Sequence, residues 1–221
     1  MSNEVVKYHN DLNRISMRDW SAEEMNFFFS IVWAIKNQGT KCVKLKRDDL
    51  SQLAEYSRKS NLEMKTILKR LGNHMYQMHW YREESKNGRY ILEFAPMFTR
   101  ARFEWTEDLS DMTAFIEVTD EFKYLVIDLS ANFTSLELKQ FTQLKSTYSK
   151  TAYRLLKQFR SKGYREFDLE EFKLLFGIPK SYRATNVQKR VLEPIQKELK
   201  DYFLNLEINP VKKRTHGNPI I

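Results

Sequence analysis

Arginine, lysine and asparagine side chains gather between residues 180 and 190, where they could bind a polyanion. Asn186, Lys189 and Arg190 lie near the exposed start of an amphipathic segment, 186–200, that is predicted to be a helix. Arginine can bridge guanine O6 and N7, and asparagine can pair with adenine, so such a helix could read bases in a major groove. The loop before it could hold phosphates. Its polar residues are Lys180, Ser181, Tyr182 and Arg183.

Further basic residues could extend this surface. In the second half they are Lys150 and Arg154, which form a stripe with Lys157 on the polar face of a predicted helix, and the turn Lys212, Lys213 and Arg214. A single lysine is usually a solvated surface residue, but a loop, a helix and a turn together favour DNA contact. In the first half the basic residues are Arg58, Lys59, Lys65 and Lys69. There, DNA contact and an ordinary solvated face are equally good interpretations.

The charge distribution supports a basic surface in the second half. Residues 1–127 hold nineteen Lys and Arg against nineteen Asp and Glu, whereas residues 128–221 hold eighteen against ten and so carry the whole net charge of +8. Residues 145–165 include seven basic side chains and no acid. A one-sidedly basic, helical segment indicates a partner that is a polyanion, and nucleic acid is the first candidate.

The residue types needed for catalysis are poorly represented. None of the four histidines forms the His-x-His pair of a metal-dependent nicking enzyme, and there is no Cys-rich zinc pattern or Gly-rich phosphate loop. Acidic pairs such as Glu23-Glu24 lie at predicted helix starts, where the helix dipole favours them. We therefore expect a non-enzymatic protein without metal or cofactor.

The elements of the first half follow the order of a winged helix. Three Ser/Thr-x-x-Glu capping boxes predict helix starts, at Ser21, Ser60 and Thr134. Asn87-Gly88 is a strong hairpin turn between strands that would form the wing. The predicted elements are a helix over 25–38 ending at Gly39, a strand over 42–46, helices near 48–56 and 61–75, a hairpin over 79–93, and strands over 116–118 and 124–127.

The second half repeats this plan without close sequence similarity. Pro194 removes a helix amide and should kink or break the 186–200 helix. The other predicted elements are helices over 138–144, 148–159 and 169–176, and strands over 165–167 and 202–208, with little returning strand after the basic turn. The sequence thus predicts an α+β protein of two tandem winged-helix domains, at 1–130 and 131–221, since the charge balance also changes near 128–132.

The cellular setting is predicted from two features. The opening residues have no apolar core of a signal peptide, and no apolar run approaches the ~20 residues needed to span a bilayer. The single cysteine, Cys42, cannot form an internal disulfide. We expect a cytoplasmic protein with no membrane contact.

Several segments resemble the plasmid replication initiator (Rep) proteins of the RepB/RepE type, and most closely those of Gram-positive hosts. The strongest marker is the Ser-x-x-x-Tyr-Arg-Leu pattern that starts at Ser149. The resemblance also covers Val6-Lys-Tyr-His-Asn-Asp-Leu-Asn13, the whole of 141–159, Ile178-Pro-Lys-Ser-Tyr182 and Lys189-Arg-Val-Leu-Glu-Pro194.

The resemblance implies a protein that binds repeated origin sites (iterons) in double-stranded DNA and starts plasmid replication. It further implies a homodimer through the N-terminal domain that represses its own gene at an inverted operator repeat, and recruitment of the host replication initiator, helicase or primase. By the same resemblance, Ser149, Lys150, Tyr153 and Arg154 would meet the DNA backbone, while Asn186, Lys189 and Arg190 would face bases.

Two other functions are compatible with parts of the sequence. A winged-helix transcriptional regulator without a replication role would have the same composition. A nickase or primer-making polymerase would need a tyrosine or carboxylate centre, which the motifs do not indicate.

Overall fold

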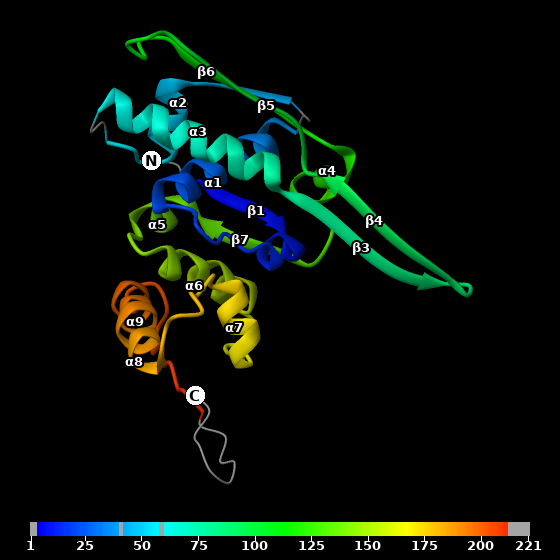
Figure 1. The fold of residues 1–221 in the computed structure, drawn as a ribbon, viewed down its shortest axis with the longest axis vertical. Helices are drawn as coiled ribbons and strands as arrows, with labels where there is room; N and C mark the ends of the chain where they lie inside the picture. Colours follow the sequence, from blue (N-terminus) through cyan, green and yellow to red (C-terminus); the bar gives the residue numbers. More distant parts are fainter. Residues whose placement is uncertain (1–3, 40–41, 58–59, 212–221) are drawn as a thin grey trace.

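Short helices and three small β-sheets make up the described residues, 4–39, 42–57 and 60–211, of a computed structural model (Figure 1). The first part contains β1 (Val5–His9), the 3-10 helix η1 (Asn10–Arg14), α1 (Ala22–Gln38), β2 (Cys42–Lys46), α2 (Arg47–Leu53), α3 (Asn61–Gln77), β3 (His79–Lys86), β4 (Arg89–Pro96), β5 (Phe98–Trp105), β6 (Met112–Val118) and α4 (Asp120–Val126). The rest contains β7 (Phe133–Glu137), α5 (Leu138–Gln143), α6 (Thr147–Gln158), α7 (Leu169–Leu175), α8 (Ala184–Val187), the π-helical turn η2 (Gln188–Leu192) and α9 (Glu193–Leu199).

Helix α1 is the centre of the first part. The predicted capping box is present, because the amide of Glu24 donates to Ser21 Oγ and the amide of Ser21 donates to Glu24 Oε2. The helix ends at Gly39, whose φ of 62° suits a residue without a side chain. Phe27 and Ile31 are buried as well as the predicted apolar face, because β1, α2, α3, α5 and α6 surround this helix.

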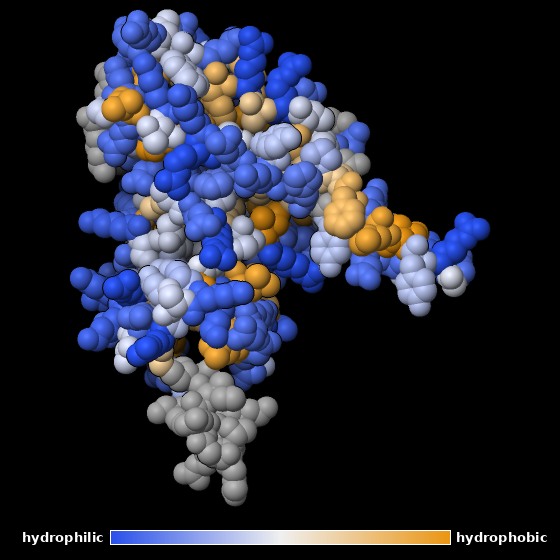
Figure 2. All heavy atoms as spheres, viewed as in Figure 1, coloured by the Kyte–Doolittle hydropathy of each residue, from blue (hydrophilic) through white to orange (hydrophobic). Residues whose placement is uncertain are grey.

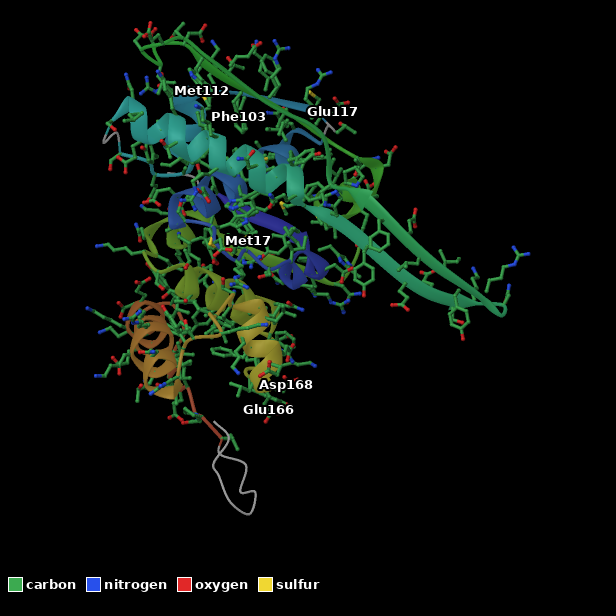
Figure 3. The ribbon with its side chains drawn as sticks, in the orientation of Figure 1. Met17, Phe103, Met112, Glu117, Glu166 and Asp168 are labelled. Atoms are coloured by element: carbon green, nitrogen blue, oxygen red, sulfur yellow. The ribbon has the colours of Figure 1, made fainter. Side chains whose placement is uncertain are left out.

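The wing of the first winged helix lies at β5 and β6, and the prediction that it is the 79–93 hairpin is wrong. Strands β2, β6 and β5 form one antiparallel three-stranded sheet, in which β5 and β6 are a hairpin that packs beside α3. Phe103 of β5 faces α3 (Figure 3), and a Cβ at Gly72 would lie 3.5 Å from its ring. The Asn87-Gly88 hairpin exists, but it is an insertion between α3 and the wing.

This insertion, β3–β4, projects from the body as a two-stranded arm (Figure 1). Its register runs from His79 opposite Pro96 to Lys86 opposite Arg89. The arm is paired only within itself among the described strands. We call residues 79–96 the arm below.

Two other predicted elements of this region are wrong. The 124–127 segment is part of helix α4, whose apolar residues Phe122, Leu125 and Val126 are buried at helical rather than strand spacing. Thr134 does not cap a helix. It lies in β7, where its hydroxyl donates to Asn10 Oδ1 at 2.8 Å and accepts from Asn13 Nδ2 at 3.0 Å.

Residues 132–158 pack onto the N-terminal part of the chain. Strand β7 pairs with β1 in antiparallel register, and the amide of Leu138 donates to the carbonyl of Glu4 at 2.8 Å. Asn13 Nδ2 also donates to Gln158 Oε1 at 2.9 Å, at the end of α6. Residues as far as Gln158, beyond the predicted boundary near residue 130, are therefore attached to β1 and η1.

The last part consists of α7 and the helical segment 184–199. Asp168 caps α7, because the amide of Glu171 donates to its Oδ1 at 2.8 Å. The predicted strands 165–167 and 202–208 are not formed. Neither has a partner strand among the described residues, and an unpaired strand leaves its backbone hydrogen bonds unmade.

Gly177 allows α7 to approach the loop after η1. Its φ is +62°, and a Cβ there would lie 3.0 Å from both Cα and Cβ of Arg18. We expect Gly177→Ala to lower the free energy of unfolding by about 2–3 kcal/mol, from left-handed strain plus displaced packing. Gly163→Ala is the matched control, because its φ is +76° but its Cβ would meet nothing within 4 Å. Equal losses in urea unfolding would contradict the close approach.

Candidate nucleic-acid interface

The predicted DNA-reading segment presents its basic residues to solvent. Helical structure runs from residue 184 to 199, and it buries Val187, Val191, Ile195 and Leu199 as expected. The exposed residues of the loop and helix are Lys180, Ser181, Arg183, Lys189 and Arg190, while Tyr182 and Asn186 are half-buried. The structure thus brings the candidate phosphate-binding loop and the candidate base-reading residues onto one stretch of surface.

Pro194 distorts this helix without ending it. The residues directly before it form the π-helical turn η2, and the amide of Glu193 bonds to the carbonyl of Gln188, five residues back. A proline cannot donate to the carbonyl four residues before it, which favours a wider turn at that point. The predicted irregularity is confirmed, but a break between Glu193 and Pro194 is wrong.

Arg190 is held against the loop that precedes its helix. Its guanidinium lies 5.5 Å from the centre of the Tyr182 ring. A hydrogen bond from Arg190 lowers the pKa of the Tyr182 hydroxyl, and burial raises the pKa of the neighbouring Tyr148 to about 12. This contact orders an exposed arginine, which reduces the entropy that it would lose on binding a ligand.

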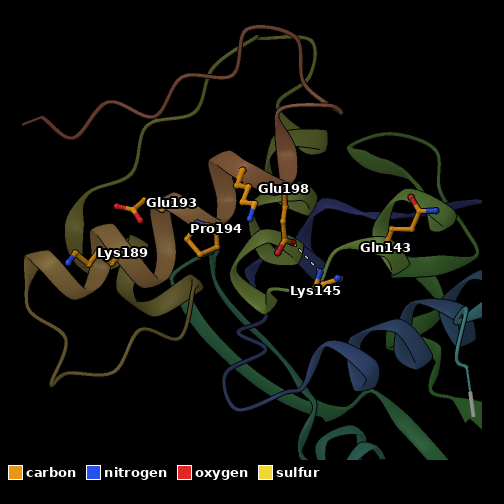
Figure 4. Close-up of a pocket in the computed structure, with 7 residues that line it drawn as sticks. Gln143, Lys145, Lys189, Glu193, Pro194 and Glu198 are labelled. Carbon is orange, nitrogen blue, oxygen red and sulfur yellow. Dashed lines mark hydrogen bonds between the residues drawn. The ribbon is translucent and has the colours of Figure 1, made fainter. Parts of the chain in front are cut away.

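An open groove of about 540 Å³ runs beside this helix (Figure 4). Lys145, Lys189 and Lys197 line it together with Glu193 and Glu198. Lys145 and Lys197 extend the basic surface beyond the predicted residues. Helical spacing places Lys197 on the same polar face as Lys189 and Arg190, whereas the position of Lys145 depends on the pairing of the loop before α6 with α9.

The predicted basic stripe on α6 is wrong, because the structure buries it. Ser149, Lys150, Tyr153 and Arg154 each have no exposed surface. Lys150 Nζ donates to Asn26 Oδ1 at 2.6 Å and to the carbonyl of Phe141 at 2.5 Å. These side chains cannot meet a DNA backbone in this conformation.

The buried side chains of Lys150 and Arg154 lie over aromatic rings. Lys150 Nζ lies 4.4 Å from the ring centre of Phe141, and the Arg154 guanidinium lies 5.5 Å from that of Phe29. Burial lowers the pKa of Lys150 to about 7 and also lowers the pKa of Arg154. The sequence predicts an exposed polar face for α6. In the folded protein α6 lies between two parts of the chain, so both its faces are covered.

Tyr153 and Lys157 of the same helix are paired with one carboxylate. Tyr153 Oη donates to Glu137 Oε2 at 2.9 Å, and Lys157 Nζ donates to the same oxygen at 2.5 Å. Burial alone would raise the pKa of Glu137, but these hydrogen bonds lower it. Glu137 therefore remains ionised and holds β7 to α6.

In the first part, α3 presents a smaller candidate surface. Lys69 is exposed, whereas Lys65 is half-buried and donates to the carbonyl of Glu107 in the wing. Leu62 and Tyr76 are also strongly exposed on this helix, at 76% and 82%. Their helical spacing relative to Lys69 could have marked them as part of the same stripe.

Five predicted residues cannot be placed. Arg58, Lys59, Lys212, Lys213 and Arg214 lie outside the described residues. Over the part of the chain that is described, no group of three or more His, Cys, Asp or Glu could hold a metal ion, and no helix is long and apolar enough to cross a membrane.

Comparison with known families identifies the chain. Residues 5–157 match the family model described as "Initiator Replication protein, WH1", and residues 168–221 match "Initiator Rep protein, WH2". The chain belongs to the initiator replication protein family. Its fold comprises two winged-helix domains, WH1 and WH2, as the sequence predicted.

Two similar proteins agree with this assignment. The chain is 30% identical to a "Probable replication protein rep" of Bifidobacterium longum, over 98% of this chain and 72% of the relative. This relative comes from a Gram-positive host, as the resemblance implied. The fold is also similar to a crystal structure of the Pi initiator protein in complex with iteron DNA, with a TM-score of 0.59 and 15% identity over 91% of this chain and 87% of that one.

The division of this initiator protein into its two domains remains a proposal. We propose that WH1 extends through α6, because β7, α5 and α6 pack on β1 and α1 and the two family matches leave only residues 158–167 between them. WH2 would then begin near α7.

The buried Lys150 predicts a specific dependence of stability on pH. Its pKa is about 7 in the folded protein and near 10.5 in the unfolded chain, so between these values the unfolded state binds a proton that the folded state lacks. The free energy of unfolding should therefore rise with pH in this range. From pH 7 to 9 the wild type should gain up to about 1.4 kcal/mol per pH unit relative to Lys150→Met.

Urea unfolding at several pH values measures this gain. Lys139→Met, at an exposed lysine of α5, controls for the loss of one positive charge. Parallel pH profiles for the wild type and Lys150→Met would show that Lys150 does not carry a displaced pKa.

Proposed function

We propose that this protein is a plasmid replication initiator that binds iterons in double-stranded origin DNA. The observation that carries the proposal is the exposed basic loop and helix of WH2, where Lys180, Arg183, Lys189 and Arg190 face solvent together. Membership of the initiator family and the likeness to a fold solved with iteron DNA support it. In this proposal Asn186, Lys189 and Arg190 face bases, while the loop from Lys180 to Arg183 holds phosphates.

The first domain would add a second, weaker contact. Exposed Lys69 and Tyr76 lie on α3, the helix of WH1 that corresponds in order to a winged-helix recognition helix. Two small contacts on one chain strengthen binding by raising the effective concentration of the second. We propose that WH2 provides the main DNA contact and WH1 an accessory DNA contact.

We further propose that the protein acts without bond-making chemistry, in the cytoplasm, and that it recruits a host initiator, helicase or primase. The absence of nucleotide and metal motifs in the sequence supports the first point. Nicking and nucleotide-incorporation assays with Mg²⁺ should remain blank. Nicking or nucleotide incorporation that is lost on changing one tyrosine or carboxylate would overturn the proposal of a non-catalytic protein.

A regulator without a replication role is the alternative function. Such a regulator would bind the repeats without supporting origin-dependent plasmid replication.

Base and phosphate contacts can be separated by two substitutions. The full chain first selects a duplex from random DNA. Arg190→Ala should weaken binding to that duplex by about 1–3 kcal/mol while leaving random DNA nearly unchanged. Lys180→Ala should weaken both alike and reduce the slope of log affinity against log salt by about 1. Equal effects of both substitutions on both DNAs would contradict the assigned roles.

The arm supports a homodimer through WH1, which would suit repression at an inverted repeat. The strand register places Tyr81, Tyr90, Leu92 and Phe94 on one face, and each is at least 60% exposed. Figure 2 shows apolar residues along the projecting arm. An isolated two-stranded hairpin is only marginally stable in water, so an exposed apolar face on it favours a covering partner.

Adjacent residues of the arm offer a matched test of this dimer. Leu92→Asp should weaken self-association at least about tenfold, because it removes an apolar side chain from this face and places a second carboxylate there opposite Glu83. Ile91→Asp, on the opposite face of the same strand, should change it much less. Sedimentation equilibrium over a range of concentrations measures both constants. A chain that is monomeric throughout, or equal effects of the two variants, would exclude dimerisation through this face.

A further inference from the structure

A carboxylate from WH2 binds the start of the last helix of WH1. Glu198 of α9 accepts a hydrogen bond from the amide of Lys145 at 3.0 Å (Figure 4). It also accepts one from the amide of Ser146 at 3.3 Å. Ser146 is the N-cap of α6. Amides at a helix start are only partly used within the helix and carry positive potential, so a carboxylate binds them by charge-assisted hydrogen bonds.

Further contacts place Glu198 within a continuous interface between α6 and the end of α9. Tyr202 Oη donates to Gln143 Oε1 at 3.2 Å. The Tyr153 ring contacts those of Tyr202 and Phe203, with centroid separations of 6.0 and 5.7 Å. Tyr153 is itself buried in WH1, so this interface connects α9 to the core of the first domain.

The other side of WH2 is also attached to WH1. Ser16 Oγ donates to the carbonyl of Leu174 in α7 at 3.1 Å, and Gly177 approaches the backbone of Arg18 closely. These contacts seat α7, but they do not involve the helix that carries Lys189 and Arg190. The angle of that helix relative to WH1 depends on its own attachment to α6, in which Glu198 supplies the hydrogen bonds to the helix start and the Tyr202 and Phe203 rings supply the packing.

We propose that Glu198 is a positioning residue that fixes the spacing between the DNA contacts of the two domains. Arg190 lies eight residues before Glu198 on one helical segment, about 12 Å away along its axis. A change of angle at Glu198 would therefore shift Arg190 relative to α3. Each base pair added between two contacted segments moves one of them by about 3.4 Å along the DNA axis and rotates it by about 34° about that axis. A fixed angle between the two domains would therefore accept only one spacing of the two segments. This inference rests on the proposed function.

The test uses the full chain and a duplex that it selects from random DNA. Footprinting locates the segments contacted by each domain, and one base pair is then inserted between them. The wild type should lose at least about tenfold in affinity on insertion, comparable to losing one good base contact. Glu198→Ala should lose no more than about threefold, and Glu198→Gln, whose amide oxygen can still accept, should behave more like the wild type.

Glu193→Ala is the matched control. Glu193 is exposed and lines the same groove on the same helical segment. Its substitution by alanine removes the same negative charge near DNA. It should keep the insertion penalty of the wild type. The same penalty in Glu198→Ala and Glu193→Ala, or a footprint with a single contacted segment, would overturn the role of Glu198 while leaving DNA binding intact.

A measurement without DNA separates this inference from the proposed function. Cys42 is the single cysteine, is exposed and lies in WH1, so it can carry one spin label, and Ser181→Cys in WH2 can carry the second. Pulsed electron paramagnetic resonance should give one narrow distance distribution that broadens in Glu198→Ala and not in Glu193→Ala. An equally narrow distribution in Glu198→Ala would overturn the proposal whether or not the chain selects DNA.

Discussion

Two cations buried beside aromatic rings determine how this initiator is assembled. Lys150 and Arg154 have no exposed surface and lie over the rings of Phe141 and Phe29. Burying a charge is expensive unless it is compensated. Lys150 Nζ has two hydrogen-bond acceptors at this position, whereas Nε and Nη1 of Arg154 have no hydrogen-bond partner among the described residues and its guanidinium lies over the Phe29 ring. The helix that carries them, α6, contacts α1 and β7 on one side and α9 on another. The fit of α6 into WH1 therefore positions the α9 side of WH2, while α7 is attached separately beside Ser16 and Arg18.

The positive charge of the second half thus has two different uses. One set of basic residues is internal and holds α6 in place, as Lys157 does through Glu137. The other set, Lys180, Arg183, Lys189 and Arg190, is exposed at the surface. The net charge of the sequence cannot distinguish the two sets, because it counts buried and exposed basic residues alike. Only the exposed ones can attract a polyanion.

The sequence predicted what depends on local chemistry. The caps at Ser21, Ser60 and Asp168 and the irregularity before Pro194 were all recognisable, because each is decided by hydrogen bonds within one turn of helix. The two winged-helix domains followed from the order of these elements together with the family resemblance.

What failed depended on partners far away in the chain. Thr134 has the spacing of a cap but pairs in a strand with β1, more than a hundred residues earlier. The 202–208 pattern alternates as a strand should, yet it has no neighbouring strand in the described residues. The sequence predicts an exposed polar face on α6, because periodicity shows that a helix has two faces but not what covers each of them. The arm was recognised as a hairpin but not as an insertion, since only the pairing of β2 with β6 identifies the true wing.

Amide hydrogen–deuterium exchange of the full chain, alone and with a selected duplex, tests most directly whether α6 is an internal support and the WH2 helix an external DNA contact. We predict that amides of residues 147–158 exchange among the slowest in the free protein and are unchanged by DNA, while amides of residues 180–190 exchange more slowly when DNA is bound than in the free protein. Fast exchange in α6 without DNA, or new protection there with none at 180–190, would contradict this account.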